Sequence, residues 1–466
     1  MKKTLYLALF ATLVMTACTD ELFQVPITDK ESSNFFKSEV EIEEAVNGVY
    51  STLQFTGLYN LYIPALGEIS SDDAFDEVPA NDNGIYGELD EFTTVTSNAL
   101  ITRTWKDSYI GIQYANTVLN RIEGISFTTP ATKNARIGEM QFIRALLYFN
   151  LVRLFGDVPL VIEETKNPND FFGKGRTPLD QVYQQIISDL TNAIANLPVS
   201  TTQQGRVIKT AAQALLGKVL LTRKDYNGAK TQLQAVVSSG KHSLLAKPEE
   251  IFSISNENNA EIIFSVQFAS GINGNTEGSA AHQQFSPSGT VSGAKGHNLP
   301  SKQLVALYAA NDLRKNAYVG TTSIGTPFSK KLVKPTTSPA DGASNFVVLR
   351  YADVLLMLAE VENELNNTSS AATYLNQVRK RAGLADATAS NQADLRTAIE
   401  LERRLEFIGE GHRWFDLLRY GKAVEVMNEW FKSVGKLITI NSNRLLMPIP
   451  QGQIDTDPAI KQNPGY

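Results

Sequence analysis

The chain has 466 residues, of which 42% are hydrophobic, a content typical of globular proteins with a buried core and not of disordered chains. Acidic residues outnumber basic residues by 49 to 43, which gives a formal charge of -6. Because a net negative chain is repelled by the phosphate backbone of nucleic acids, we expect no nucleic-acid partner.

The first residues have the pattern of a secretory signal. Lys2 and Lys3 precede an apolar run over 5–15, and the small residue Ala17 stands directly before Cys18, the one cysteine of the chain. The apolar run is too short to span a bilayer. We therefore predict a signal peptide over 1–17 and a lipid anchor on Cys18, with a lone buried cysteine as the alternative. Removing 1–17 deletes two lysines and no acid, so the charge changes from -6 to -8.

Helical periodicity marks several stretches of the first half of the chain. Apolar residues recur at helical spacing over 40–53, 105–122 and 137–155. A further helix is expected to begin after Pro178 and to end at Pro198.

The stretch 68–91, called the acidic segment below, lacks this periodicity. It holds nine acids and no lysine or arginine, and 81–84 is a strong turn signal, so we predict a loop. Its carboxylates could cleave a glycosidic bond or bind calcium, but Pro79 stands where a calcium loop needs its first ligand, and paired acids are too common to indicate hydrolysis. Acids that are solvated or that hydrogen bond a ligand are the favoured interpretation.

Two further stretches have the spacing of a tetratricopeptide helix pair, a repeat of ~34 residues with small and apolar residues at fixed offsets. The positions are Leu216, Gly217, Leu220, Ala229, Leu233 and Val236, then Leu358, Ala359, Ala371, Leu375 and Val378. Leu190, Ala193 and Pro198 match the second helix of another pair, whose first helix lies around Ala145 and Tyr148. Because these copies are separated by more than one period, the sequence predicts helix pairs with large insertions.

The longest such interruption is glycine-rich. It covers 268–300 and contains six glycines and little periodicity, while 261–268 alternates weakly and predicts a strand. Loops inserted into a helical frame are the places where function is most often found.

Near the C-terminus, 402–421 predicts two short helices that end near glycines. Glu400 and Arg404 stand four apart, and Arg413 and Asp416 stand three apart, so ion pairs that clamp this hairpin are the favoured interpretation. The alternative is an acid/base site made of His412, Asp416 and Glu410.

Candidate ligand residues come from the loops. A sugar stacks on an aromatic ring while acidic and amide groups bind its hydroxyls, which makes the candidates Asp72, Asp73, Asn81, Asp82, Tyr86, Trp105 and Phe285. For each ring, burial against the helical frame is the alternative. The sequence contains no phosphate loop, nucleophile elbow, CxxC motif or histidine pair at zinc spacing, so no catalytic residue is predicted.

Four stretches closely resemble the SusD/RagB family of surface nutrient-binding lipoproteins: 140–161, 349–365, 402–421 and 445–466. The resemblance implies an all-α fold, an α-α superhelix of tetratricopeptide-like helix pairs with large loop-rich insertions. It also implies an N-terminal helical region over 18–250 and a C-terminal region with the loop-rich insert over 251–466.

The same resemblance implies a function. A family member is expected to be a binding protein and not an enzyme, anchored by lipid to the extracellular face of the outer membrane. It would capture a glycan or oligosaccharide and deliver it to a SusC-like TonB-dependent transporter, and a peptide or other oligomeric nutrient is the alternative ligand. The missing catalytic motifs disfavour a glycoside hydrolase, and the loop insertions disfavour a pure tetratricopeptide scaffold. No cofactor is expected, and a structural calcium ion stays open.

Overall fold

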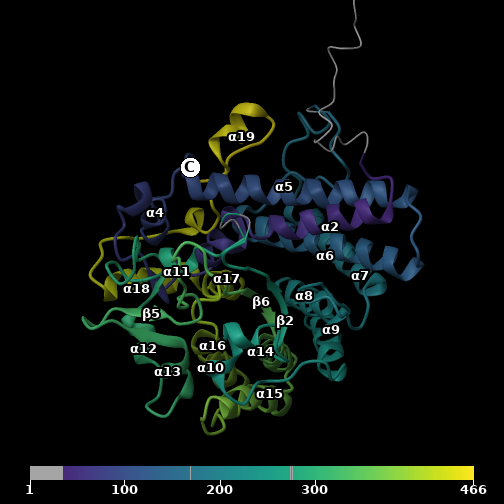
Figure 1. The fold of residues 1–466 in the computed structure, drawn as a ribbon. Coiled ribbons are helices and arrows are strands. Elements are labelled where there is room, and N and C mark those ends of the chain that lie inside the picture. The colour runs from purple at the N-terminus through teal and green to yellow at the C-terminus, as the bar shows by residue number, and fades with distance from the viewer. Residues whose placement is uncertain (1–34, 168, 273, 275–276) are drawn as a thin grey trace, which may run out of the picture.

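The computed structural model describes residues 35–167, 169–272, 274 and 277–466, and helices dominate it (Figure 1). The longer helices of the first half are α2 (Glu39–Thr52), α5 (Ala99–Arg121), α6 (Pro130–Phe155), α7 (Leu179–Asn196), α8 (Lys209–Thr222) and α9 (Tyr226–Ser238). Those of the second half are α14 (Tyr351–Glu364), α15 (Thr368–Arg381), α16 (Gln392–Glu406), α17 (Arg413–Tyr420) and α18 (Ala423–Ser433). This arrangement confirms the all-α prediction.

Short elements fill the connections. The short α-helices are α3 (Tyr62–Leu66), α4 (Gly87–Asp90), α10 (Pro248–Ile251), α11 (Ala281–Gln284), α12 (Lys302–Ala306), α13 (Leu313–Tyr318) and α19 (Gln451–Thr456). The π-helical turn is η3 (Thr56–Asn60), and the 3-10 turns are η4 (Asn81–Gly84), η5 (Ile122–Gly124), η6 (Ile254–Asn256) and η7 (Ser442–Arg444). In the described part of the chain, no helix is both long and apolar enough to cross a membrane.

The helix ends follow the local sequence. Ser38 caps α2 together with Glu41 in a reciprocal capping box, and Asn98 accepts hydrogen bonds from two backbone N–H groups at the start of α5. Gly156 ends α6 with a φ of 72°, a conformation that glycine adopts without strain. The helices α5 and α6 begin earlier than their apolar periodicity indicates, because periodicity cannot locate a first turn that is partly exposed.

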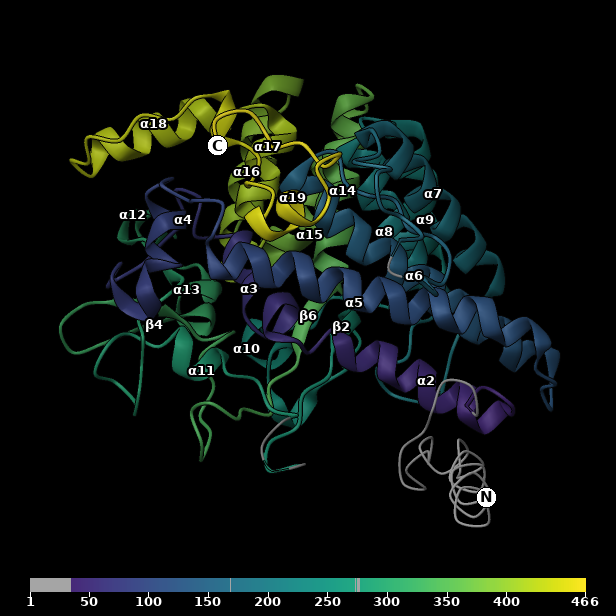
Figure 2. The same cartoon turned by 90° about the horizontal axis from the view of Figure 1, so that it is seen from above.

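The helices stack in antiparallel pairs. α6 packs on α7, α8 on α9 and α14 on α15, and the pairs join through contacts of α7 with α8 and of α9 with α14. α2 and α5 run beside α6 along one side of the molecule (Figure 1, Figure 2). A side chain at Gly217 would come within 2.6 Å of Leu233, so the small residue of the repeat pattern is the point where α8 and α9 touch. The predicted helix pairs are therefore confirmed.

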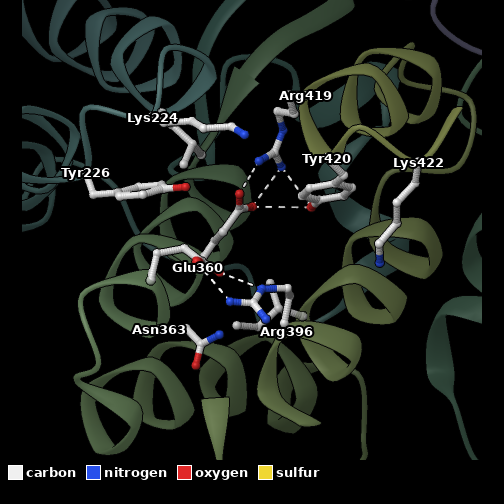
Figure 3. Close-up of a pocket in the computed structure, with 11 residues that line it drawn as sticks. Lys224, Tyr226, Glu360, Asn363, Arg396, Arg419, Tyr420 and Lys422 are labelled. Carbon is white, nitrogen blue, oxygen red and sulfur yellow. Dashed lines mark hydrogen bonds and ion pairs between the residues drawn. The ribbon is translucent and has the colours of Figure 1, made fainter. Parts of the chain in front are cut away.

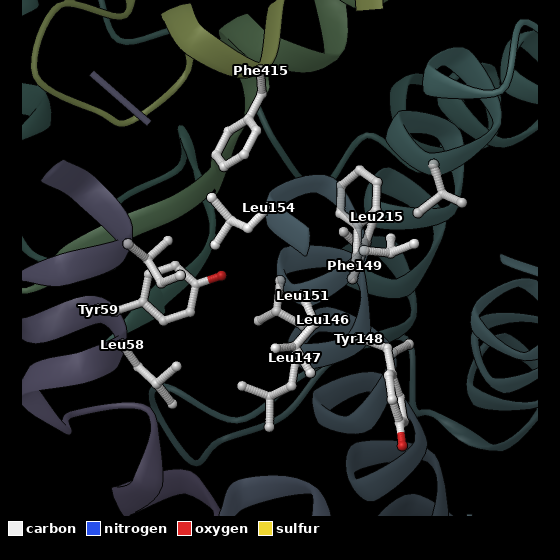
Figure 4. Packing of buried hydrophobic residues seen from close by; sticks show 14 of the residues in the cluster. Leu58, Tyr59, Leu146, Leu147, Tyr148, Phe149, Leu151, Leu154, Leu215 and Phe415 are labelled. Carbon is white, nitrogen blue, oxygen red and sulfur yellow. The ribbon is translucent and has the colours of Figure 1, made fainter. Parts of the chain in front are cut away.

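The largest core is built around α6. Leu146, Leu147 and Phe149 of α6 are buried between Leu58 and Tyr59 of η3 on one side and Leu215 of α8 on the other (Figure 4). Phe415 of α17 is also part of this core, which joins the C-terminal helices to the N-terminal frame. Burial of such side chains stabilises each by roughly 1.5–3 kcal/mol relative to exposure.

The described residues form three two-stranded antiparallel ladders. They pair β1 (Ala74–Phe75) with β3 (Leu299–Pro300), β2 (Ile262–Val266) with β6 (Phe346–Arg350), and β4 (Val319–Thr321) with β5 (Pro327–Ser329). Strand β2 confirms the prediction for 261–268. The β1–β3 ladder holds the acidic segment against the end of the glycine-rich insertion.

A buried cluster of charged side chains lies in the C-terminal half of the chain. Arg350 is 1% exposed and donates to the carboxylates of Glu261, Glu406 and Glu410 at 2.7–2.9 Å. Arg314 and Arg381 add further contacts to Glu406. Because Glu261 precedes β2, Arg350 ends β6 and Glu406 ends α16, the cluster joins the strands to the C-terminal helices.

Candidate functional site

The charges of the C-terminal hairpin pair with the acidic segment, more than 300 residues away in sequence. Arg404 lies 2.7 Å from Asp72 and 2.5 Å from Asp73, and the Nε of Arg413 lies 2.8 Å from Asp72. Glu400 pairs with Arg413 and not with Arg404, so the expected pair at four-residue spacing is wrong in its partner. Asp416 pairs with Arg403 and Arg419 and not with Arg413, so the expected pair at three-residue spacing is wrong as well. The charges do form ion pairs, but those of Arg404 and Arg413 hold the hairpin to a distant loop.

The acid/base alternative at the hairpin is not supported. Asp416 binds Arg403 and Arg419, and Glu410 binds Lys331 and Arg350, so cations occupy both carboxylates.

His412 of this alternative is buried and its ring stacks on Phe407 with centroids 4.6 Å apart. Burial, and then the nearby Lys218, lower the pKa of His412 to about 3, which leaves the imidazole neutral at physiological pH. The three groups are thus part of the packed interior.

Glu68 of the acidic segment is buried where this segment meets the C-terminal hairpin, and its ionisation provides a test of that contact. Burial and the neighbouring Asp73 raise the pKa of Glu68 from 4.5 to about 8, although its carboxylate accepts the N–H of Gly411 at 2.9 Å. Since the folded protein holds this proton more tightly than the unfolded chain, stability falls as pH rises from 4.5 to 8. We expect Glu68→Gln, which keeps an acceptor for Gly411, to lose less stability between pH 5 and pH 9, measured by urea unfolding. An equal loss in both proteins would contradict this.

The three candidate rings lie inside the protein. Tyr86, Trp105 and Phe285 are each 1–2% exposed. Trp105 packs edge-on against Phe155 with centroids 5.0 Å apart, and Tyr86 stacks on His297 at 3.8 Å. The structure thus shows the alternative foreseen for these rings, burial against the frame, and none presents a face for stacking in this conformation.

The candidate acids divide into two groups. Asp72 and Asp73 are buried, and their carboxylates form ion pairs with Arg404 and Arg413. The expectation that these two acids are solvated or bind a ligand is therefore wrong, because the fold brings the two distant arginines to them. Asn81 and Asp82 lie on η4 at the surface. The Asn81 amide donates to the carbonyl of Lys295 at 2.8 Å, and the Lys295 ammonium binds Asp82 at 2.6 Å.

His297, near the end of the glycine-rich insertion, contacts two carboxylates of the acidic segment. His297 contacts Asp76 at 2.9 Å through Nδ1 and Asp82 at 3.1 Å through Nε2. Both ring nitrogens of His297 are thus engaged by carboxylates of the acidic segment. His297 was not predicted as a site residue, because its partners lie more than 200 residues away in the sequence.

A half-buried ring lies at the edge of these loops. Tyr62 meets the buried Tyr86 edge-on with centroids 5.9 Å apart. Burial raises the pKa of Tyr62, while Arg103 lowers it and Asp82 raises it, which places these charges around the phenol. The side chain of Arg103 is 52% exposed and binds Asp107 through Nε, and in the described part of the chain its two terminal nitrogens make no hydrogen bond.

Together, Tyr62, Asn81, Asp82, Arg103 and Lys295 form what we call the loop surface. It offers a ring, an amide, a guanidinium and an ion pair at partly exposed positions. The candidates predicted from the sequence include Asn81 and Asp82; they do not include Tyr62, a ring beside a predicted loop, nor Arg103 and Lys295. Within the described residues, no group of three or more His, Cys, Asp or Glu side chains could hold a metal ion.

A separate cavity of about 160 Å³ opens between the α8–α9 turn, α14, α16 and the end of α17 (Figure 3). Its lining includes the aromatic rings of Tyr226 and Tyr420 and the Glu360–Arg419 pair. It shares no residue with the loop surface.

The sequence matches two protein-family models and several related proteins. A model of the SusD family matches residues 315–466, and a second model, described as starch-binding associating with outer membrane, matches residues 27–221. A SusD-like protein of Formosa agariphila is 27% identical over 97% of both chains, and one of Bacteroides ovatus is 26% identical over 90% of this chain and 83% of its own.

Solved structures agree with these matches. A laminarin-binding SusD-like protein is 28% identical, with a TM-score of 0.81 over 92% of this chain and all of its own. A SusD homologue from Bacteroides thetaiotaomicron, 23% identical, shares the fold with a TM-score of 0.83 over 94% of this chain and 99% of its own. With family-model matches in both halves of the chain, relatives along nearly its whole length and the same fold, the protein belongs to the SusD family.

Proposed function

We propose that this protein is a non-catalytic glycan-binding protein of the cell surface. The observation that carries the proposal is the match to the laminarin-binding SusD-like protein, which covers that protein's full length at 28% identity. The description of the family model over 27–221 as starch-binding agrees with it. Laminarin is therefore the first ligand to test, within a panel of polysaccharides.

The loop surface is the part of the molecule that we assign to the glycan. The half-buried ring of Tyr62 can take the C–H face of a pyranose, a contact that needs little side-chain ordering because Tyr86 already holds the ring edge-on. The free nitrogens of Arg103 can donate to hydroxyls, and Asp82, held by Lys295 and His297, can accept from them. Each group is fixed by a neighbour, which lowers the entropy lost on binding.

The assignment predicts that Tyr62, and not every surface tyrosine, contributes to glycan binding. Tyr62→Ala should weaken glycan binding about tenfold, because one stacked ring contributes on the order of 1.4 kcal/mol. Retardation in native gels that contain each polysaccharide of the panel measures this.

Tyr114→Ala is the matched control, since Tyr114 is a 48% exposed tyrosine on α5, the helix that also carries Arg103. Equal losses in both variants, or none in Tyr62→Ala, would remove the glycan from the loop surface. If no polysaccharide binds but peptides do, the ligand is a peptide and the proposal fails.

We also propose that the protein is anchored by lipid on Cys18 at the extracellular face of the outer membrane, where it delivers the glycan to a SusC-like TonB-dependent transporter. Cys18 lies outside the described residues, so support comes from the signal pattern before it and from the outer-membrane association in the family description.

The anchor and the partner can be tested in one fractionation. The wild-type protein should remain in the outer-membrane fraction after a high-salt wash and co-purify with a TonB-dependent transporter, whereas Cys18→Ala should be released because it lacks the acyl chains. A Cys18→Ala protein that stays with the membrane would contradict the lipid anchor, and wild-type protein without a transporter would contradict the partner.

A further inference from the structure

The cavity of Figure 3 lies on the frame of helix pairs and has its own chemistry, independent of the proposed glycan surface. Its volume of about 160 Å³ is below the range of roughly 300–1,000 Å³ typical of pockets for drug-sized ligands. It therefore has room for one small group and not for a chain of several sugars.

Two ion pairs form the wall of the cavity. Glu360 binds Arg419 with both carboxylate oxygens, and Glu364 binds Arg396 in the same way at 2.7 and 3.0 Å. Because these carboxylates stand four residues apart on α14, the two pairs lie one turn from each other along one helix. The pairs fix the shape of the wall and neutralise the two arginines.

The lysines of the lining are left with unused donors. Lys422 donates to Glu400 at 2.6 Å, which leaves two of its three N–H groups for a ligand. No hydrogen bond or ion pair engages the Lys224 ammonium among the described residues. In Figure 3 the Lys224 side chain extends toward the Glu360–Arg419 pair, and Tyr226 lines the same cavity. Lys224 is exposed at the mouth of the cavity, and an anionic group is the ligand that best matches its ammonium.

The backbone at Lys224 adopts the left-handed conformation. This residue has a φ of 62°, on the tight turn between α8 and α9, where glycine or asparagine is less strained. A lysine at such a position costs stability that glycine would not cost, and strain of this kind is often kept at binding sites.

Two tyrosines of the lining indicate which other groups a ligand of this cavity should have. Tyr226 and Tyr420 present rings to the cavity, and Figure 3 shows both hydroxyls directed toward Glu360. Burial, then Glu364 and Glu360, raise the pKa of Tyr226, so the phenol keeps its proton at neutral pH and can donate a hydrogen bond. Rings, a phenol donor and carboxylate acceptors together suit a ring-shaped ligand with hydroxyl groups.

We propose that this cavity binds a sugar acid, with its carboxylate on Lys224, its ring against Tyr226 or Tyr420, and its hydroxyls on the carboxylates of the wall. A neutral sugar leaves Lys224 without a counter-charge. A simple carboxylate such as acetate has no hydroxyl for the acceptors and no face for the rings.

The test uses the chain from residue 19 onward, which contains every described residue, titrated calorimetrically with glucuronate, glucose and acetate. Glucuronate should bind at least tenfold more tightly than glucose or acetate. Equal affinity for glucuronate and glucose would overturn the role of the charge, and equal affinity for glucuronate and acetate would overturn the role of the ring.

Variants at Lys224 separate binding from structure. Lys224→Met should weaken glucuronate binding at least tenfold, while Lys302→Met, at an exposed lysine of α12, should leave it unchanged. Lys224→Gly should lose binding equally while its Tm stays level or rises, because glycine relieves the strained φ. Retained binding in Lys224→Met would overturn the proposal. Tyr62→Ala should leave glucuronate affinity unchanged, so failure of the glycan surface and failure of this cavity are distinguishable.

Discussion

Arg350→Met is expected to lower the free energy of unfolding by about 3–5 kcal/mol, the range for breaking a buried ion pair from one side. Arg350 is 1% exposed and donates hydrogen bonds to the carboxylates of Glu261, Glu406 and Glu410. Its Nη2 also donates to the backbone carbonyl of Glu406 at 2.9 Å. Methionine fills part of the volume but leaves these acceptors without their shared cation. Urea unfolding followed by circular dichroism measures the loss.

The control for this prediction is an ion pair at the surface. Lys380 lies 3.2 Å from Asp386, with side chains 66% and 54% exposed, so Lys380→Met should change stability by less than about 1 kcal/mol. Similar unfolding midpoints for Arg350→Met and Lys380→Met would show that the buried cluster does not hold the strands to the C-terminal helices.

Gly67→Ala should destabilise the protein by about 3 kcal/mol, since the added methyl group meets backbone that cannot turn away. Gly67 follows α3, its carbonyl accepts the N–H of Trp414 at 2.9 Å, and a Cβ there would lie 2.1 Å from the carbonyl oxygen of Gly411. Relief requires that α3 and the loop before α17 move apart. The Tm of the variant, read by differential scanning calorimetry, should fall clearly.

Gly48→Ala is the same substitution in open space. Gly48 lies in α2, and no atom would come within 4 Å of the new Cβ, so we expect a gain of up to about 1 kcal/mol from helix propensity. Opposite signs for the two variants would locate the effect in the contact between Gly67 and Gly411. A Gly67→Ala protein as stable as the wild type would show that these backbones are not in close contact.

The helical frame could be predicted from local pattern. The spacing of Gly217 and Leu233 indicates a tight helix pair, and the structure shows that the two residues touch. The strand expected over 261–268 exists as β2, which is rich in β-branched and aromatic residues, whereas its partner β6 begins 80 residues after β2 ends. Periodicity therefore identifies the elements, but not which strands pair.

The burial and ion pairing of the acidic segment could not be predicted from local pattern. An excess of carboxylates without nearby cations is typical of a solvated loop, and only the fold brings Arg404 and Arg413 to Asp72 and Asp73. The same long-range effect hides part of the loop surface, since Lys295 contacts η4 from more than 200 residues away in the sequence. The candidate rings stand near predicted loops in the sequence, but loop position does not determine burial, and Trp105 lies inside the core.

Calorimetric titration of laminarin into the chain from residue 19 onward, with Tyr62→Ala in parallel, tests glycan capture most directly. We predict saturable binding by the wild type that weakens about tenfold in Tyr62→Ala, with an unchanged Tm in both proteins. Binding of equal strength in the two proteins would contradict the assignment to the loop surface, and the absence of binding to laminarin and to every other polysaccharide would contradict glycan capture itself.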